Sequence, residues 1–318
     1  MDLGPGPGLL GTAERCLVEL LGRLDALGYD FVTPTPATHK RVLARAGKAE
    51  ALTLRDIFGW SRAFRRETLR DDLLDLLARG GALAEDGGLC RSRLRVSRVA
   101  GLLFAHGAYP TDRPDSVFLG PDTYRFVRFV RSRAARVAGA RRIVDMGAGA
   151  GVGGIVAGRL APGARVTLVD ANPDALRLAR INAAAAGAAA ETFLAERIDD
   201  VAGAIDLVIA NPPFIMDEGG PAYRDGGEML GAGLSRDWAL GAARRLEPGG
   251  AMLLYTGSAI VAGRDALRET LERDLPRLGC TLDYEEIDPD IFGEQLDLPA
   301  YRTVERIAAV GAVISHGP

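Results

Sequence analysis

The chain has 318 residues, of which 47% are hydrophobic, 25% charged and 6% aromatic. This composition is typical of a globular protein with a large core, and it excludes a disordered chain, a collagen-like repeat and a disulfide scaffold. The length favours two domains. Because Cys16, Cys90 and Cys280 lie far apart and form no Cys-x-x-Cys pair, we expect no metal site and a reducing, cytoplasmic location.

Charge is distributed unevenly along the chain, although the formal net charge is only −3. Residues 1–142 hold 24 Lys and Arg against 16 Asp and Glu, whereas residues 143–318 hold 15 against 26. The densest basic stretch is 116–142, where Asp122 is the only acid. Such a stretch indicates a solvated helix face or an anionic partner such as nucleic acid. The chain has no apolar run of membrane-spanning length and no signal-peptide pattern, so we expect no membrane partner.

The first third of the chain reads as helices followed by a β-ribbon. Apolar residues at helical spacing predict three helices, over 11–28, 53–59 and 66–79. The segment 29–42 contains Pro34 and Pro36 and predicts a turn. Residues 82–106 predict two short strands around an Asp-Gly-Gly turn. We therefore expect a small helical or winged-helix-like domain over 1–115, with substrate recognition as its role.

From about residue 140 the pattern changes to short apolar runs that alternate with helical stretches. Continuous apolar strands separated by helices are typical of a mostly parallel sheet that is covered on both faces. Two of the predicted helices are 173–187 and 235–246. Seven strands are predicted, over 142–146, 165–170, 191–195, 205–210, 251–255, 282–287 and 306–314. The fold class is therefore α/β, with a seven-stranded, Rossmann-like sheet.

A glycine-rich turn follows the first of these strands, with glycines at 147, 149 and 151. Such glycines let the backbone turn tightly and approach a ligand, and the helix that follows adds a favourable dipole. Asp170 ends the second strand, where its carboxylate can accept the ribose hydroxyls of a nucleotide. The loop fits the S-adenosylmethionine (SAM) pattern Asp145-x-Gly-x-Gly-x-Gly as well as a dinucleotide fingerprint. It alone does not distinguish SAM from NAD(P).

The motif Asn211-Pro212-Pro213-Phe214 follows the fourth strand and favours SAM. Two prolines remove two backbone donors and stiffen the turn, so the Pro212 carbonyl can point into a pocket. Together with the Asn211 side-chain oxygen it forms an acceptor pair for the two hydrogens of a planar amine or amide. Phe214 offers a ring on which a flat substrate can stack. This arrangement predicts nitrogen methylation, with Asn211, Pro212 and Phe214 as catalytic residues.

On these motifs, residues from about 116 onward resemble class I SAM-dependent methyltransferases of the small-methyltransferase group. That group includes the HemK-like glutamine N5-methyltransferases and enzymes that methylate guanine N2 or adenine N6. The resemblance implies that Asp145, Gly147 and Gly149 hold the methionine part of SAM, Asp170 the ribose and Glu196 the adenine edge. The cofactor set that it implies also includes Ala148, Gly151, Ala171, Asn172, Arg197 and Asn211.

The segment Val117–Thr123 is similar to the one that precedes the catalytic domain in glutamine methyltransferases. Protein glutamine N5 is therefore the leading acceptor, and a nucleobase in RNA or DNA is the alternative, favoured by the arginines of 116–142. A SAM-binding regulator without activity is a third possibility. The methyltransferase domain is expected over 116–318, with Thr123, Pro213 and Tyr223 as substrate contacts and without a metal.

Overall fold

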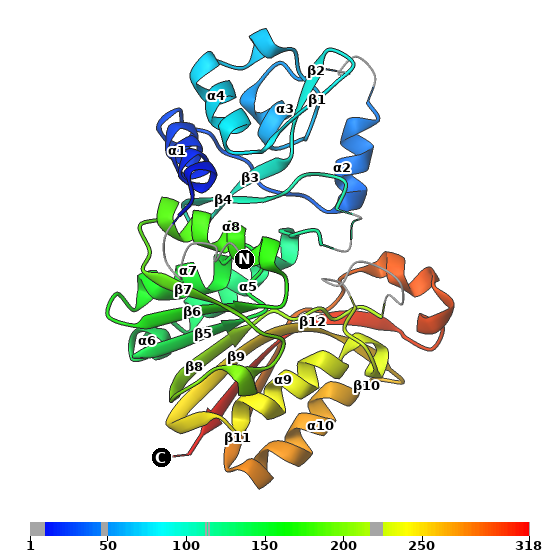
Figure 1. Cartoon of the computed structure of the whole chain (residues 1–318). Coiled ribbons are helices and arrows are strands. Elements are labelled where there is room, and N and C mark those ends of the chain that lie inside the picture. The colour runs from blue at the N-terminus through cyan, green and yellow to red at the C-terminus, as the bar shows by residue number, and fades with distance from the viewer. Residues whose placement is uncertain (1–9, 46–49, 112, 114, 217–224, 318) are drawn as a thin grey trace, which may run out of the picture.

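The computed structural model describes residues 10–45, 50–111, 113, 115–216 and 225–317. Figure 1 shows the helices and hairpins of the first third stacked on an α/β part built around one large sheet. Within the described ranges, every helix falls short of the length and apolarity that a bilayer-spanning segment requires. In the same ranges no His, Cys, Asp and Glu side chains gather as a group that could hold a metal ion.

The first third contains helices followed by two antiparallel hairpins, β1–β2 and β3–β4. Two of the sequence predictions for this part of the chain were incomplete. The helix expected over 66–79 is split, because Leu69 adopts an extended conformation, and a second hairpin accompanies the one predicted around Asp-Gly-Gly. The elements are α1 (Thr12–Ala26), α2 (Pro36–Leu43), α3 (Leu54–Phe58), the 3-10 helix η1 (Arg66–Thr68), α4 (Asp71–Arg79), β1 (Leu83–Asp86), β2 (Leu89–Ser92), β3 (Leu94–Val99) and β4 (Leu102–Gly107).

Helix α2 occupies part of the segment 29–42 that the sequence predicted as a turn, and that prediction was wrong for residues 36–42. Thr35 caps the helix, since its hydroxyl accepts a hydrogen bond of 3.2 Å from the Thr38 amide. Pro36 stands at the start of the helix, where its missing N–H leaves no intrahelical bond unmade and its fixed φ suits the helix. Proline here begins a helix instead of interrupting one.

The sheet has the strand order β11-β12-β9-β8-β5-β6-β7, and a two-residue strand, β10, pairs with β9 off this path. Strands β7, β6, β5, β8 and β9 are mutually parallel, whereas β12 is antiparallel to both of its neighbours. All seven predicted strands are present. Their bounds are β5 (Arg142–Met146), β6 (Arg165–Asp170), β7 (Ala190–Leu194), β8 (Ile205–Ala210), β9 (Leu246–Val261), β10 (Arg264–Asp265), β11 (Cys280–Asp288) and β12 (Arg306–His316).

Helices cover both faces of this sheet. Helices α7 and α8 share one apolar core with the first third of the chain, and α9 and α10 form a second core on the opposite face. The helices of this part are α5 (Pro121–Ser132), α6 (Ala134–Ala138), α7 (Val152–Leu160), α8 (Pro173–Ala185), α9 (Gly233–Ala243) and α10 (Ala266–Asp274), with short 3-10 helices η2 (Ile198–Asp200), η3 (Met229–Gly231), η4 (Leu275–Leu278), η5 (Gly293–Asp297) and η6 (Pro299–Tyr301).

A buried side-chain amide connects the first third to the sheet part. Asn182 of α8 is fully buried. Its Oδ1 accepts a hydrogen bond of 2.8 Å from the Ala105 amide, and its Nδ2 donates to the carbonyls of Ala105 (2.9 Å) and Ala150 (2.8 Å). Each such bond contributes about 1 kcal/mol net. The amide thus joins strand β4 to the glycine-rich turn after β5.

Candidate cofactor and acceptor site

The turn after β5 adopts the backbone that its glycines allow. Gly147, Gly149 and Gly151 have φ values of 70°, 53° and 79°, a region that other residues rarely adopt. A Cβ on Gly147 would lie 2.6 Å from Trp238 Cη2, whereas a Cβ on Gly149 would meet no atom within 4 Å. The first glycine is therefore required by a packed ring, and the second borders open space in which a ligand can approach the backbone.

Asp145 lies beneath the start of α7. It is almost completely buried, and its Oδ2 accepts a hydrogen bond of 2.6 Å from the Gly154 amide. Burial, only partly offset by this bond, raises the pKa of its carboxyl group to about 7. A carboxylate in this position is poorly compensated by the protein alone, so a cationic ligand group beside it would be stabilised.

Asp170, at the end of β6, is held by the neighbouring loops. Its Oδ2 accepts a hydrogen bond of 2.8 Å from the Gly149 amide, and its Oδ1 accepts one of 2.9 Å from the Asn172 amide. Burial raises the pKa of this carboxyl group, while the amides lower it. Each oxygen keeps a further lone pair, so the fixed carboxylate can accept hydroxyl groups of a ligand.

The remaining residues of the expected cofactor set differ in their surroundings. Asn172 caps α8 by accepting a hydrogen bond from the Asp174 amide, and its Nδ2 donates to the Asp115 carbonyl. Its side chain is thus occupied by the fold. Ala148 donates its amide hydrogen to the Val169 carbonyl. Ala171, Glu196 and Arg197 are exposed, and Arg197 forms an ion pair of 2.7 Å with Asp199.

The motif Asn211–Phe214 leaves the end of β8 beside the glycine-rich turn. The Asn211 Oδ1 atom is buried and has no hydrogen-bond partner among the described residues. A buried acceptor without a partner is costly, so its presence indicates a donor that the protein itself does not supply. The Phe214 ring is only 8% exposed and makes an edge contact with Phe292 at 5.5 Å. It is packed as part of the wall, with little ring surface open for stacking.

Two residues that sequence reasoning missed lie next to this motif. Tyr255 of β9 is fully buried and follows Leu254, the register partner of Ala210 in β8. Its hydroxyl donates a hydrogen bond of 2.7 Å to Asp122 Oδ1 in the first turn of α5. Asp122 is buried, and burial raises its pKa. The sequence does mark Asp122, because it is the only acid among the arginines of 116–142. It does not indicate the partner, Tyr255, which lies 133 residues further along the chain.

The segment between β11 and β12 supports the chain after the motif. The Tyr301 hydroxyl accepts a hydrogen bond of 2.7 Å from the Met216 amide and lies 3.3 Å from the Leu230 carbonyl. Of the expected substrate contacts, Thr123 accepts a 3.4 Å hydrogen bond from the Gly120 amide, and Pro213 is half-buried. Tyr223 lies outside the described residues.

These features together fit a nucleoside cofactor with a charged tail. The Asp170 carboxylate suits a ribose, the open backbone at Gly149 allows close approach, and the buried Asp145 suits a cation. The strand order, with an antiparallel strand inserted beside β9, and this loop agree with the expected resemblance to the fold of class I SAM-dependent methyltransferases. SAM is the cofactor of this class.

Residues 131–273 match the family described as "Methyltransferase small domain". Over this segment, which is less than half of the chain, the sequence is similar to the small-methyltransferase group. Among curated proteins, it is 32% identical over 129 residues to "Ribosomal RNA small subunit methyltransferase C" of Shigella flexneri and to the protein of the same name in Escherichia coli K12. The match covers 41% of this chain and 34% of each relative. The chain therefore matches about a third of the length of these relatives.

Solved structures with a similar fold include two RNA methyltransferases. One is the "M.jannaschii tRNA m1G37 methyltransferase", with 14% identity, a TM-score of 0.49, and coverage of 81% of this chain and 61% of that chain. The other is the "T. Thermophilus 16S rRNA N2 G1207 methyltransferase" with AdoMet and guanosine, with 14% identity, a TM-score of 0.46, and coverage of 81% and 64%.

Proposed function

We propose that this protein transfers the methyl group of SAM to an exocyclic amino nitrogen of a base in RNA. The observation that carries the proposal is the unpartnered, buried Asn211 Oδ1 at the end of β8. The curated relatives, named as ribosomal RNA methyltransferases, support a nucleobase as acceptor. They favour the nucleobase alternative over protein glutamine N5, which was the leading expectation from residues 117–123.

The Asn211 oxygen and the Pro212 carbonyl act by holding the acceptor nitrogen. An exocyclic amine is a poor nucleophile because its lone pair is delocalised into the ring. Hydrogen bonds to both of its hydrogens favour a tetrahedral nitrogen whose lone pair points out of the base plane. Bound SAM supplies an electrophilic methyl carbon. The nitrogen loses one proton to solvent after it has bonded to that carbon, so no strong base is needed in the site.

The cofactor side of the site has a separate set of residues. We propose that Asp145, Gly147 and Gly149 hold the methionine part of SAM, that Asp170 accepts the ribose hydroxyls and that Glu196 lies along the adenine edge. Ala148, Gly151, Ala171 and Asn172 shape the turns that carry these groups. Arg197, which pairs with Asp199, supports the loop of Glu196.

The test is transfer of a labelled methyl group. Purified protein and labelled SAM are incubated with small-subunit ribosomal RNA transcribed without modifications, and in parallel with a cell lysate treated with nuclease or protease. We expect label in RNA, lost with nuclease and kept after protease, and a methylated guanosine or adenosine after digestion to nucleosides. Label that disappears only with protease would support a glutamine acceptor instead. SAM binding without transfer to either fraction would support a regulator.

A further inference from the structure

Helix α2 and the residues just after it present basic side chains that have no acidic partner among the described residues. The sequence from 31 to 49 contains Lys40, Arg41, Arg45 and Lys48 and no Asp or Glu, and the two lysines are the only ones in the chain. Lys40, Arg41 and Arg45 are exposed. In the part of the chain that the structure describes, none of these three side chains forms an ion pair with a carboxylate. Their charges are therefore available to an anionic partner.

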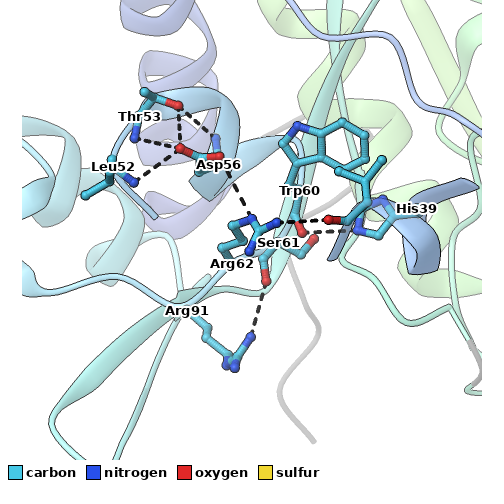
Figure 2. Close-up of polar contacts among 9 residues, drawn as sticks. His39, Leu52, Thr53, Asp56, Trp60, Ser61, Arg62 and Arg91 are labelled. Carbon is cyan, nitrogen blue, oxygen red and sulfur yellow. Dashed lines mark hydrogen bonds and ion pairs between the residues drawn. The ribbon is translucent and has the colours of Figure 1, made fainter. Parts of the chain in front are cut away.

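The buried residue His39 attaches the helix to the protein. Its Nε2 donates a hydrogen bond of 3.1 Å to the Trp60 carbonyl (Figure 2), and its Nδ1 accepts one of 3.2 Å from Arg95. The ring stacks on Tyr109 at a centroid distance of 4.1 Å. Burial, and secondarily Arg95, lowers the pKa of His39 to about 4, so it is neutral near pH 7. The helix is thus rigidly placed.

Buried arginines lie directly below this helix. Arg62 is 5% exposed, and its Nη2 donates to the carbonyl of Val42 in α2. Figure 2 shows Asp56 beside Arg62, with 4.0 Å between Oδ1 and Nε. The Asp56 carboxylate already accepts hydrogen bonds from the amides of Leu52 and Thr53 and from the Thr53 hydroxyl. Asp56 is one carboxylate against two buried arginines, Arg62 and Arg95, so the interior beneath helix α2 keeps a net positive charge.

The other basic stretch, 116–142, is partly neutralised within the fold. Arg125 pairs with Asp122 and Asp288, and Arg133 pairs with Glu285. The acids of β11 therefore reduce the charge that this stretch can offer to a partner. The exposed arginines of α5 and α6 that keep no such partner among the described residues are Arg128, Arg131 and Arg136.

Helix α2 is also connected to the acceptor side of the site. The Thr33 amide, two residues before the cap of α2, donates a hydrogen bond of 3.0 Å to the Tyr124 hydroxyl. Tyr124 follows Asp122 and Thr123 in α5, and Asp122 is bonded to Tyr255 beside the Asn211 motif. Figure 1 places α2 on the same side of the molecule as the segment with η5 and η6, whereas α6 lies on the other side.

We propose that Lys40 and Arg41 of α2, together with Arg45 just after the end of the helix, bind the phosphate backbone of the RNA on one side of the target base. This inference rests on the proposed function. It assigns phosphate contacts to α2 and not to the arginine-rich stretch 116–142. Phosphate contacts fix the position of a nucleic acid without reading its sequence, and their loss is visible in the salt dependence of binding.

The test compares two triple variants with equal loss of charge. One carries Lys40→Gln, Arg41→Gln and Arg45→Gln, and the control carries Arg128→Gln, Arg131→Gln and Arg136→Gln. RNA affinity is measured as a function of salt. For the α2 variant we expect an affinity about tenfold lower or more, and a log–log salt slope less steep by about 2, as the loss of three phosphate contacts implies. We expect the control to match the wild type.

Unchanged SAM affinity and melting temperature in both variants show that the fold is intact. A salt slope that is unaltered in the α2 variant, or reduced only in the control, would overturn the inference while the wild type still methylates RNA. Failure of the wild type to bind or methylate RNA would instead refute the proposed function, and this inference with it. A supporting kinetic result is a raised KM for RNA with little change in kcat.

Discussion

The Tyr255 hydroxyl donates a hydrogen bond of 2.7 Å to Asp122 Oδ1 and so joins the sheet beneath the acceptor motif to the first turn of α5. Arg125 also contacts Asp122, at 3.4 Å, and it continues to Asp288 at the end of β11. The position of α5 therefore depends on apolar packing and also on a polar chain that is buried at Tyr255 and Asp122 and half-buried at Arg125 and Asp288. Removing one member leaves a buried group without its partner.

Tyr255→Phe keeps the ring and removes this hydrogen bond. We expect the free energy of unfolding to fall by about 1–3 kcal/mol, because Asp122 stays buried with one donor fewer. We also expect weaker SAM or RNA binding, measured as a raised KM. The control is Tyr284→Phe, which removes another 2.7 Å bond, to Asp265, away from the site. Equal kinetic effects of the two variants would show that Tyr255 has only a structural role.

The pH dependence of SAM binding should follow Asp145. The pKa of this group is about 7 in the folded protein, and we expect the cationic end of SAM to bind its ionised form. Affinity should therefore fall as pH drops below about 7, by up to tenfold per pH unit. Calorimetry between about pH 6 and pH 8 measures this change in SAM affinity. Asp145→Asn should bind more weakly at high pH and lose the dependence; a steep profile in that variant would contradict the assignment.

The same group affects the stability of the protein without ligand. Its folded-state pKa is raised above the unfolded value, so the folded state binds more protons between the two values. Its contribution to stability is therefore complete below about pH 4 and is lost as pH rises through about 7. Urea unfolding across this range should show Asp145→Asn gaining stability relative to the wild type at the alkaline end.

Asn211→Ala should separate catalysis from cofactor binding. The side-chain oxygen has no described partner within the protein, so its removal breaks no internal bond of that atom and should leave the melting temperature nearly unchanged. Loss of one preorganised polar contact to the reacting group typically lowers kcat by about 100-fold or more. Single-turnover methyl transfer with saturating SAM measures this. A variant with wild-type turnover would rule out the acceptor pair.

Tyr301→Phe tests whether the segment between β11 and β12 positions the acceptor loop. The variant leaves the Met216 amide without the hydroxyl that accepts its hydrogen bond. We expect a loss of about 1 kcal/mol in stability and a lower kcat, because the chain just after Phe214 becomes less well fixed. SAM affinity should not change, since the cofactor loops lie after β5 and β6. A variant with altered SAM affinity and an unchanged kcat would contradict the view that Tyr301 acts on the acceptor loop and not on the cofactor loops.

The parallel part of the fold was predictable because its strands are continuous apolar runs and its turns are marked by glycine and proline. The glycine-rich turn and Asp170 could be located for the same reason. Helix α2 was missed because Pro34 and Pro36 resemble turn residues, while the cap made by Thr35 was overlooked. Sequence gives no distance between residues far apart, so neither the Tyr255–Asp122 bond nor the pairing of Arg133 with Glu285 could be foreseen.

Phe214 illustrates a further limit of prediction from sequence. Its position after two prolines predicted an aromatic platform, yet the ring lies against Phe292, which belongs to the segment between β11 and β12. A Cβ on Gly257 would lie 2.3 Å from the Phe214 ring, so a glycine in β9 makes room for it. The motif could be recognised from sequence, but the direction of its aromatic side chain depends on distant residues.

Asn182 has a consequence for how the molecule can move. Its side-chain amide forms hydrogen bonds with the N–H and the carbonyl of Ala105 and also with the carbonyl of Ala150 in the cofactor turn. A displacement of β4 by an ångström relative to that turn would break either the two buried hydrogen bonds to Ala105 or the one to Ala150, because one amide group cannot follow both segments. Hinge motion between the hairpin and the cofactor turn is thereby suppressed, so RNA held by the first third of the chain would meet a cofactor site at a fixed distance.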